Sequence, residues 1–292
     1  MDPFTYTIHD RDGAARCGSF TTPHGALETP VFAPVGTRAT VKAMTPAQLE
    51  EIGATLVLAN AYHLYLRPGD DLVAEFGGIH SFMGWNGPML TDSGGFQVFS
   101  HGGKNDAQRS VDEDGVTFRS HIDGSEHRFT PEISIAIQEN LGADIIMAFD
   151  ECSIPDNRSY VEKAMQRTHA WAERCVKAKT RHDQALFGII QGGIFPDLRR
   201  ESADFIASLG TPGIAIGGLS VGESKDEMTS MIETVVPRLP ADRPRYLMGV
   251  GSPEDIVNGV MRGIDIFDCV LPTRMARNHA AMTRLGQMNL RK

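Results

Sequence analysis

The chain has 292 residues, of which 41% are hydrophobic and 22% are charged, and its formal net charge is −9. This composition is typical of a globular protein, and the acidic balance argues against binding nucleic acid through bulk charge, although not through a local basic patch. No apolar run approaches the roughly 18 residues that a membrane helix needs, and the polar, acidic start does not resemble a secretory signal. We therefore expect a cytoplasmic protein without membrane contact.

Eight short apolar runs, each ending in or near Gly, Asn, Asp or Pro, predict strands that are buried on both faces. In chain order they are Val31–Val35, Thr55–Asn60, Met89–Asp92, Ile145–Asp150, Leu186–Gln191, Ile214–Gly217, Tyr246–Val250 and Ile266–Leu271. Helices are expected between them from caps at Thr45, Thr130, Ser224 and Ser252, over Pro68–Phe76 and Ser159–Lys179, and before Gly210. This alternation favours a single (β/α)8 TIM-barrel domain over residues 1–292, rather than two doubly wound domains.

Two segments depart from the regular alternation. An insertion over about residues 97–130 follows the third strand, and Asp123-Gly124 between Val116–Ile122 and Glu126–Phe129 predicts a hairpin within it. About twenty residues remain after the eighth strand, so we expect no eighth helix and a basic hairpin over about 271–292. Residues 271–292 contain five lysines and arginines and no acidic residue, so this segment carries +5 and the rest of the chain −14.

Polar residues and glycines follow the predicted strands, at the end of a barrel where active sites lie. They are Asp92-Ser93-Gly94-Gly95, Asp150-Glu151-Cys152, Gln191-Gly192-Gly193, Gly217-Gly218-Leu219, Met248-Gly249-Val250-Gly251 and Asp268-Cys269. Facing carboxylates suit substitution at an acetal-like carbon, where one attacks and the other moves protons. A further carboxylate, an amide and backbone N–H groups suit a planar ring such as guanine. Structural roles stay open at this point, because Asp92 could cap a loop and Asp150 could pair with an arginine.

Six motifs carry a resemblance to a known family. They are TDSGGFQVFS at 91–100, FDEC at 149–152, FGIIQGG at 187–193, IAIGGLSVGE at 214–223, RYLMGVG at 245–251 and GIDIFDCVLPTRMARN at 263–278. From about residue 15 onward the chain resembles the tRNA-guanine transglycosylases, also called queuine tRNA-ribosyltransferases. The resemblance implies exchange of guanine at the wobble position (34) of tRNA for a 7-deazaguanine, with the anticodon loop of GUN-type tRNAs as partner.

The resemblance also implies roles for individual residues. Asp268 would be the nucleophile that attacks ribose C1′ and holds the tRNA as a covalent glycosyl ester, and Asp92 the general acid/base, with retention over two displacements. The base would bind to Ser93, Gly94, Gly95, Phe96, Asp150, Cys152, Gln191, Gly217, Gly218, Leu219 and Met248. Within this set, Asp150 and Gln191 would read the purine edge, N–H groups near Gly218 and Leu219 would bind O6, and Phe96 and Met248 would sandwich the ring.

The tRNA would contact two further segments, and its guanosine would have to flip out of the anticodon stack. The segments comprise Gly249, Val250, Gly251, Ser252, Pro253, Glu254, Asp255, Thr273, Arg274, Met275, Ala276 and Arg277. Cys152 and Val221 resemble the bacterial members, which take preQ1 (7-aminomethyl-7-deazaguanine). A side chain at Val221 narrows the pocket, whereas a glycine there would leave room for queuine.

No metal or cofactor is expected to take part in the chemistry. The ten histidines show no H-x-H or H-E-x-x-H spacing, and the four cysteines are scattered without a C-x-x-C pair. Family members carry a structural zinc site of C-x-C-x-x-C and a later His in a C-terminal segment, so zinc is expected only if such a segment exists. The resemblance further implies a homodimer.

Two other functions would use the same residues. A non-catalytic tRNA-binding partner subunit is disfavoured, because Asp92 and Asp268 are both present. A retaining glycoside hydrolase is disfavoured because such sites align aromatic side chains, and only 7% of this chain is aromatic. We expect Cys152 and Cys269 to pack rather than to react, and Asp265 to be structural.

Overall fold

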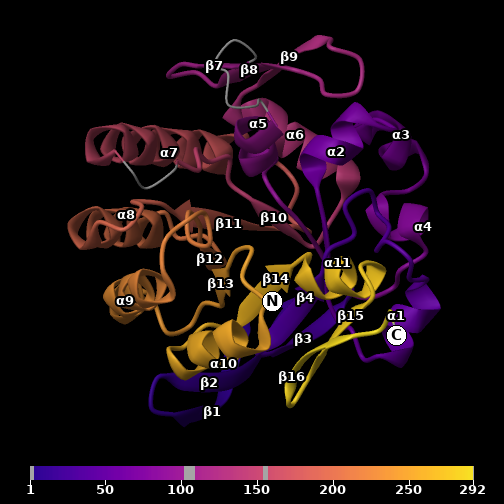
Figure 1. Ribbon diagram of the computed structural model, residues 1–292. Coiled ribbons are helices and arrows are strands. Elements are labelled where there is room, and N and C mark those ends of the chain that lie inside the picture. The colour runs from indigo at the N-terminus through magenta and orange to yellow at the C-terminus, as the bar shows by residue number, and fades with distance from the viewer. Residues whose placement is uncertain (1–2, 102–108, 154–156, 292) are drawn as a thin grey trace.

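The computed structural model describes residues 3–101, 109–153 and 157–291, and its centre is an eight-stranded parallel sheet (Figure 1). The strands are β4 (Val31–Pro34), β5 (Val57–Ala59), β6 (Met89–Thr91), β10 (Ile145–Met147), β11 (Ala185–Ile190), β12 (Gly213–Ile216), β13 (Arg245–Leu247) and β14 (Ile266–Cys269). A parallel bridge joins Val35 to Leu58 between the two end strands, and Gly36 N donates to Leu58 O at 2.6 Å. The sheet is therefore a nearly closed barrel, which confirms the predicted TIM barrel and all eight of its strands.

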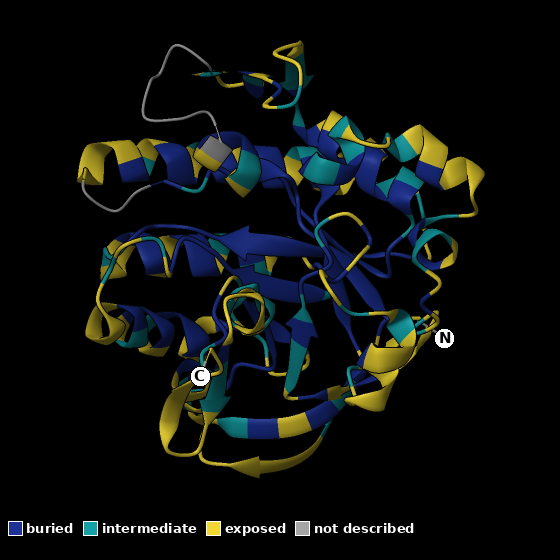
Figure 2. Ribbon diagram, turned by 45° about the vertical axis from the view of Figure 1, so that its right-hand side comes forward, coloured by how far each residue is buried: buried dark blue, intermediate teal, exposed yellow. Residues whose placement is uncertain are grey.

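Helices surround the barrel with their buried faces turned inward (Figure 2). They are α1 (Pro46–Glu51), α2 (Ala61–Leu66), α3 (Asp70–Glu75), α4 (Ile79–Met83), α5 (Gly95–His101), α6 (Pro131–Leu141), α7 (Arg158–Ala178), α8 (Pro196–Ser208), α9 (Lys225–Val235) and α10 (Pro253–Met261). The side chains of all four predicted caps, Thr45, Thr130, Ser224 and Ser252, accept a hydrogen bond from a backbone N–H in the first turn. The short helices α2, α4 and α5 were not predicted.

An antiparallel sheet of three strands, which the sequence did not predict, covers the end of the barrel where its strands begin. Its strands are β1 (Tyr6–Asp12), β2 (Ala15–Thr22) and β3 (Gly25–Thr29). Phe20 of β2 is fully buried and packs edge-on against Phe187 of β11, with ring centroids 5.9 Å apart. Asp265, just before β14, accepts hydrogen bonds from Tyr6 Oη and Arg16 Nε, so it is structural as expected. The other end of the barrel is therefore the place for a substrate site.

The insertion and the basic segment each form small elements of their own. In the insertion, β7 (Arg109–Val111), β8 (Val116–Arg119) and β9 (Glu126–Phe129) form an antiparallel sheet, which confirms the hairpin; residues 102–108 lie outside the described residues. The basic segment is a short helix, α11 (Leu271–Arg277), followed by the hairpin of β15 (Ala280–Thr283) and β16 (Gly286–Asn289). None of the residues of α11 is buried, so it does not cover the barrel as the other helices do.

Candidate active site

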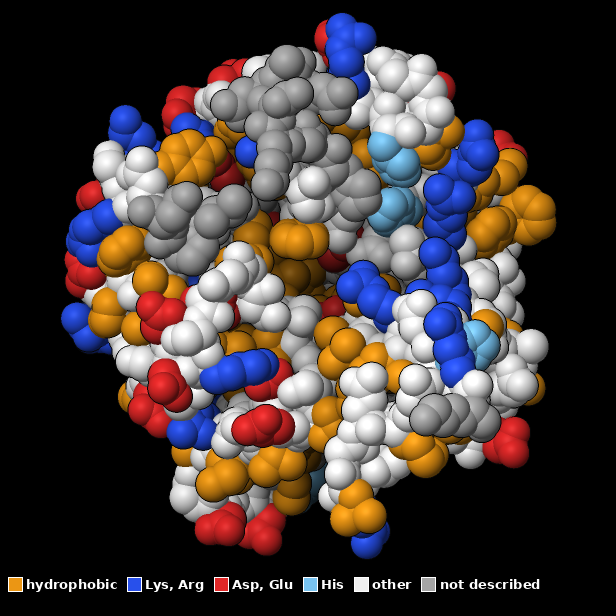
Figure 3. Space-filling view, in the orientation of Figure 1, with side chains coloured by type: hydrophobic (Ala, Val, Ile, Leu, Met, Phe, Trp, Pro, Cys, Tyr) orange, Lys and Arg blue, Asp and Glu red, His pale blue; other side chains and the backbone are white. Residues whose placement is uncertain are grey.

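Three carboxylates lie at the carboxyl ends of the barrel strands. Asp92 follows β6, Asp150 lies three residues after β10, and Asp268 lies in β14; their exposed fractions are 8%, 5% and 8%. The negative charge of Asp268 is near enough to contribute to the raised pKa of Asp92. Figure 3 shows acidic atoms inside a hollow near the middle of one face of the protein, with Lys and Arg side chains along its right-hand side. The structure thus brings together the carboxylates that the sequence placed at one barrel mouth.

Asp268 is held through one of its two carboxylate oxygens. Tyr246 Oη and Gly249 N both donate to Asp268 Oδ1, each at 2.6 Å. Burial raises the pKa of Asp268, while these two hydrogen bonds favour its charged form. Among the described residues, both bonds end on Oδ1, so Oδ2 is the oxygen that can approach a substrate atom.

Asp92 is fixed by the segment that follows β5. Asn60 Nδ2 donates to Asp92 Oδ2, and Ala61 N donates to Oδ1 at 2.8 Å. Burial raises the pKa of Asp92 to about 6, and the nearby charge of Asp268 acts in the same direction. A carboxyl group with this pKa can both donate and accept a proton near neutral pH, as a general acid/base must.

Asp150 is the centre of a hydrogen-bonded group that joins three strand ends. Ser93 Oγ donates to Asp150 Oδ1 at 2.9 Å, and Gln191 Nε2 donates to Oδ2 at 2.7 Å. Burial raises the pKa of Asp150 to about 6, although both of these hydrogen bonds favour the charged form. The group therefore presents a carboxylate from the segment after β10 and an amide from the residue after β11, beside the serine that follows Asp92.

Three of the predicted glycines leave space for this group. A Cβ on Gly218, whose φ is +64°, would lie 2.2 Å from Gln191 Oε1, and one on Gly217 would lie 2.8 Å from Gln191 Nε2. A Cβ on Gly95 would lie 2.5 Å from the carbonyl oxygen of Asp150. Since real Cβ atoms do not approach so closely, any side chain at these positions would displace Gln191 or Asp150.

The remaining predicted base-binding residues differ in exposure. Leu219 is buried, Cys152 and Met248 are half-buried, and Phe96 at the start of α5 is 51% exposed. Gly94 is buried and has a φ of +80° in the turn between Asp92 and α5. Burial raises the pKa of the Cys152 thiol to about 12, which keeps it protonated and fits packing better than nucleophilic attack.

The predicted tRNA-contacting segments divide into buried and exposed positions. Val250, Gly251 and Asp255 are buried, and Asp255 pairs with Lys225 and accepts from Ser252 Oγ at 2.7 Å. Gly249 in the loop before α10 is exposed, as are Pro253 and Glu254 at the start of that helix. Arg274, Ala276 and Arg277 on α11 are also exposed, whereas Thr273 and Met275 are half-buried. The exposed arginines therefore form a basic surface on α11, which begins two residues after β14, the strand of Asp268.

Comparisons with known proteins agree on one family. The family described as Queuine tRNA-ribosyltransferase matches residues 10–292. The chain is 62% identical over 291 residues to the queuine tRNA-ribosyltransferase of Herpetosiphon aurantiacus, covering 99% of this chain and 73% of that protein. It is 59% identical to that of Desulforamulus reducens (95% and 74% covered) and 58% identical to that of Pelotomaculum thermopropionicum (99% and 77% covered). The chain belongs to the queuine tRNA-ribosyltransferase family.

Membership of the queuine tRNA-ribosyltransferase family confirms the resemblance drawn from the six motifs. The name of the family describes a pentosyltransferase that acts on tRNA. The structure adds three polar residues to the site that the sequence did not single out. Asn60 holds Asp92, Tyr246 holds Asp268, and Arg199 of α8 donates to the carbonyl oxygens of Gly217 and Gly218. Asn60 and Tyr246 carried a signal, because Asn60 ends a predicted strand and Tyr246 lies in the motif RYLMGVG, whereas Arg199 carried none.

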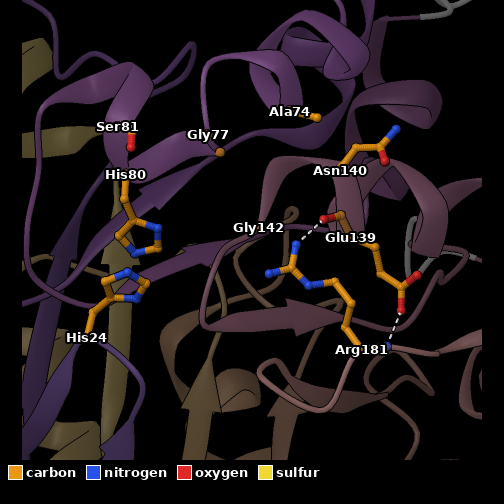
Figure 4. Close-up of a pocket in the computed structure, with 10 residues that line it drawn as sticks. His24, Ala74, Gly77, His80, Ser81, Glu139, Asn140, Gly142 and Arg181 are labelled. Carbon is orange, nitrogen blue, oxygen red and sulfur yellow. Dashed lines mark hydrogen bonds between the residues drawn. The ribbon is translucent and has the colours of Figure 1, made fainter.

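One group of possible metal ligands lies at the opposite end of the barrel from the ribosyltransferase site. His24, His80 and Asp144 bring ligand atoms within 4.8 Å of one another, and the two histidines line a cavity of about 570 Å³ (Figure 4). The imidazole rings stack at 3.6 Å and 14°, so one ion cannot lie in both ring planes. Asp144 already accepts from His24 N, His24 Nδ1, His80 Nε2 and Met89 N at 2.8–3.2 Å. This group therefore ties the antiparallel sheet to the barrel.

No helix among the described residues is both long enough and apolar enough to cross a bilayer.

Proposed function

We propose that this chain is a cytoplasmic tRNA-guanine transglycosylase that replaces guanine at the wobble position (34) of GUN-type tRNAs with preQ1, in the formation of queuosine. Membership of the queuine tRNA-ribosyltransferase family carries the general activity. The observation that supports the chemistry most strongly is the buried pair of Asp92 and Asp268, one held at a pKa near 6 and the other held through a single oxygen.

In the first displacement, Asp268 Oδ2 would attack C1′ of the flipped-out guanosine. The bond between C1′ and N9 of guanine breaks, a glycosyl ester forms, and guanine leaves with a proton from Asp92. The hydrogen bonds from Tyr246 and Gly249 support this role, because they hold the carboxylate through Oδ1 and favour its charged form.

The second displacement follows from the interaction between the two carboxylates. Formation of the ester removes the charge of Asp268, and with it one of the effects that raise the pKa of Asp92. Asp92 is then a carboxylate and can accept the N9 proton of the incoming base, which attacks C1′ and restores the charge of Asp268. Each turnover thus returns the proton to Asp92 and retains the configuration at C1′.

Recognition of the purine is proposed for the group around Asp150. Its carboxylate would accept from N1–H and the 2-amino group of guanine, and backbone N–H near Leu219 would donate to O6. The hydrogen bonds from Ser93 and Gln191 support this role, because they fix the carboxylate before the base arrives. Val221 N donates to Glu223 Oε2 at 3.0 Å in the loop after β12, and the bulk of the Val221 side chain favours preQ1 over queuine.

No observation favours a non-catalytic subunit or a glycoside hydrolase, and the chemistry needs no metal. The homodimer implied by the family stays a prediction. The function is tested by incorporation of radiolabelled guanine into an unmodified tRNA with a GUN anticodon. We expect incorporation by the wild-type protein and none above background by Asp268→Ala. Wild-type levels in this variant would overturn the assignment of the nucleophile.

A further inference from the structure

Arg199 of α8 is a fully buried arginine that contacts the ends of two barrel strands. Its exposed fraction is 0%. Its Nε donates to Gly193 O at 2.7 Å, Nη1 donates to Gly217 O at 2.7 Å and Ile190 O at 3.3 Å, and Nη2 donates to Gly218 O at 3.0 Å. All four acceptors are backbone carbonyl groups at or just after the carboxyl ends of β11 and β12, where the proposed base-binding residues lie.

Burying this cation is costly, because no carboxylate accepts a hydrogen bond from Arg199 among the described residues. Burial lowers the pKa of Arg199 to about 10, so the side chain keeps its charge at neutral pH. Glu223 contributes only a favourable charge interaction. The adjacent Arg200 is exposed, so the buried charge belongs to one position of the helix and not to the whole segment.

Because the peptide bond is planar, these contacts also fix the direction of the neighbouring backbone N–H groups. In a trans peptide, the C=O of one residue and the N–H of the next point in opposite directions. Because Gly217 O and Gly218 O point to Arg199, the N–H groups of Gly218 and Leu219 both point away from it. The left-handed φ of +64° at Gly218 allows this orientation.

We propose that Arg199 is a positioning residue for recognition of the purine O6. Its guanidinium holds the carbonyl groups of Gly217 and Gly218 on the helix side, which aims the N–H groups of Gly218 and Leu219 at the side where O6 would lie before the base binds. The cation also polarises these peptide groups and strengthens the N–H donor on the pocket side. The inference rests on the proposed function, in which a backbone N–H of this loop donates to O6.

The test measures the affinity of the purified full chain for guanine and for 6-thioguanine, in which a sulfur atom replaces O6. Sulfur is a weaker hydrogen-bond acceptor, so the wild-type protein should bind guanine more tightly. The variants are Arg199→Lys, which keeps the charge but cannot reach four carbonyls, and Arg199→Gln, with Arg200→Gln as the matched control. Thermal unfolding without ligand monitors the fold of each variant.

We expect Arg199→Lys to weaken guanine binding about tenfold, because the hydrogen bond to O6 would lose its alignment. Binding of 6-thioguanine should change much less. The preference for guanine should therefore shrink, while Arg200→Gln keeps it. An unchanged preference in a folded Arg199→Lys or Arg199→Gln protein would overturn the inference, as would equal weakening of both ligands. A wild-type protein that neither binds guanine nor exchanges it would instead refute the proposed function.

Discussion

Removing the hydroxyl group of Tyr246 should slow the chemical step and change its pH dependence. Tyr246 is 1% exposed, and its hydroxyl donates to Asp268 Oδ1 at 2.6 Å. Burial raises the pKa of Tyr246 well above its usual value, so the phenol stays a neutral donor at every working pH. In Tyr246→Phe the buried ring is kept and only the hydroxyl oxygen is removed, so the change tests mainly one hydrogen bond.

The size of the effect follows from the charge of the acceptor. A buried hydrogen bond to a charged group contributes about 1.5–3 kcal/mol, so losing the bond that orients Asp268 should reduce the rate by about tenfold or more. The same bond favours the carboxylate over the carboxylic acid, so its loss raises the pKa of Asp268 further. A higher pKa means that Asp268 ionises only at higher pH, so the acid limb of the pH–rate profile should shift to higher pH.

The assay is single-turnover guanine exchange with saturating tRNA, measured from pH 5 to pH 9. Tyr65→Phe is the matched control, because the Tyr65 hydroxyl contacts His127 Nδ1 at 2.9 Å in the insertion and not the site. We expect the control to follow the wild-type profile. A Tyr246→Phe profile that coincides with the wild-type profile in rate and acid limb would refute the role given to this hydrogen bond.

Three further predictions test base and tRNA recognition. In Gly218→Ala the new methyl group would lie 2.2 Å from Gln191 Oε1, so the steady-state KM for guanine should rise at least about tenfold; an unchanged KM would exclude a role for this loop in binding. Burial disfavours the charged form of Asp150, so Asp150→Asn should keep the melting temperature near the wild-type value. The same variant should raise the KM for guanine by about tenfold or more, and an unchanged KM would contradict the proposed purine contact. Arg277 is exposed on α11, so Arg277→Ala should reduce the slope of log K for tRNA against log salt by about 1; an unchanged slope would remove α11 from the interface.

The barrel was predictable because its strands are buried on both faces. Such strands read as short apolar runs ended by turn residues, and runs such as Ile145–Asp150 and Leu186–Gln191 overlap β10 and β11. The antiparallel sheet of β1 to β3 escaped prediction because β2 (Ala15–Thr22) is rich in small and hydroxyl residues. Its buried positions, such as Phe20, are defined by packing against the barrel and not by an apolar run.

Site residues that directly follow a strand could be predicted from the sequence. Site residues whose contacts depend on the tertiary fold were missed. Asp92, Asp150 and Gln191 follow strand ends, and the rule for barrel active sites finds them. The contact between Tyr246 and Asp268 depends on the pairing of β13 with β14, which brings the Tyr246 hydroxyl to Asp268 on the neighbouring strand. Arg199 lies in an amphipathic helix, where a sequence pattern assigns arginine to the solvent face, and only the tertiary fold shows its buried contacts.

The most direct measurement of the proposed chemistry is the capture of the covalent intermediate. Wild-type protein is mixed with a minimal anticodon hairpin that carries the target guanosine, the sample is denatured, and the cross-linked residue is identified by mass spectrometry. We predict a protein–RNA adduct on the Asp268 side chain with the wild-type protein, and no adduct with Asp268→Asn. An adduct on another residue, or one that persists in Asp268→Asn, would contradict the proposed mechanism.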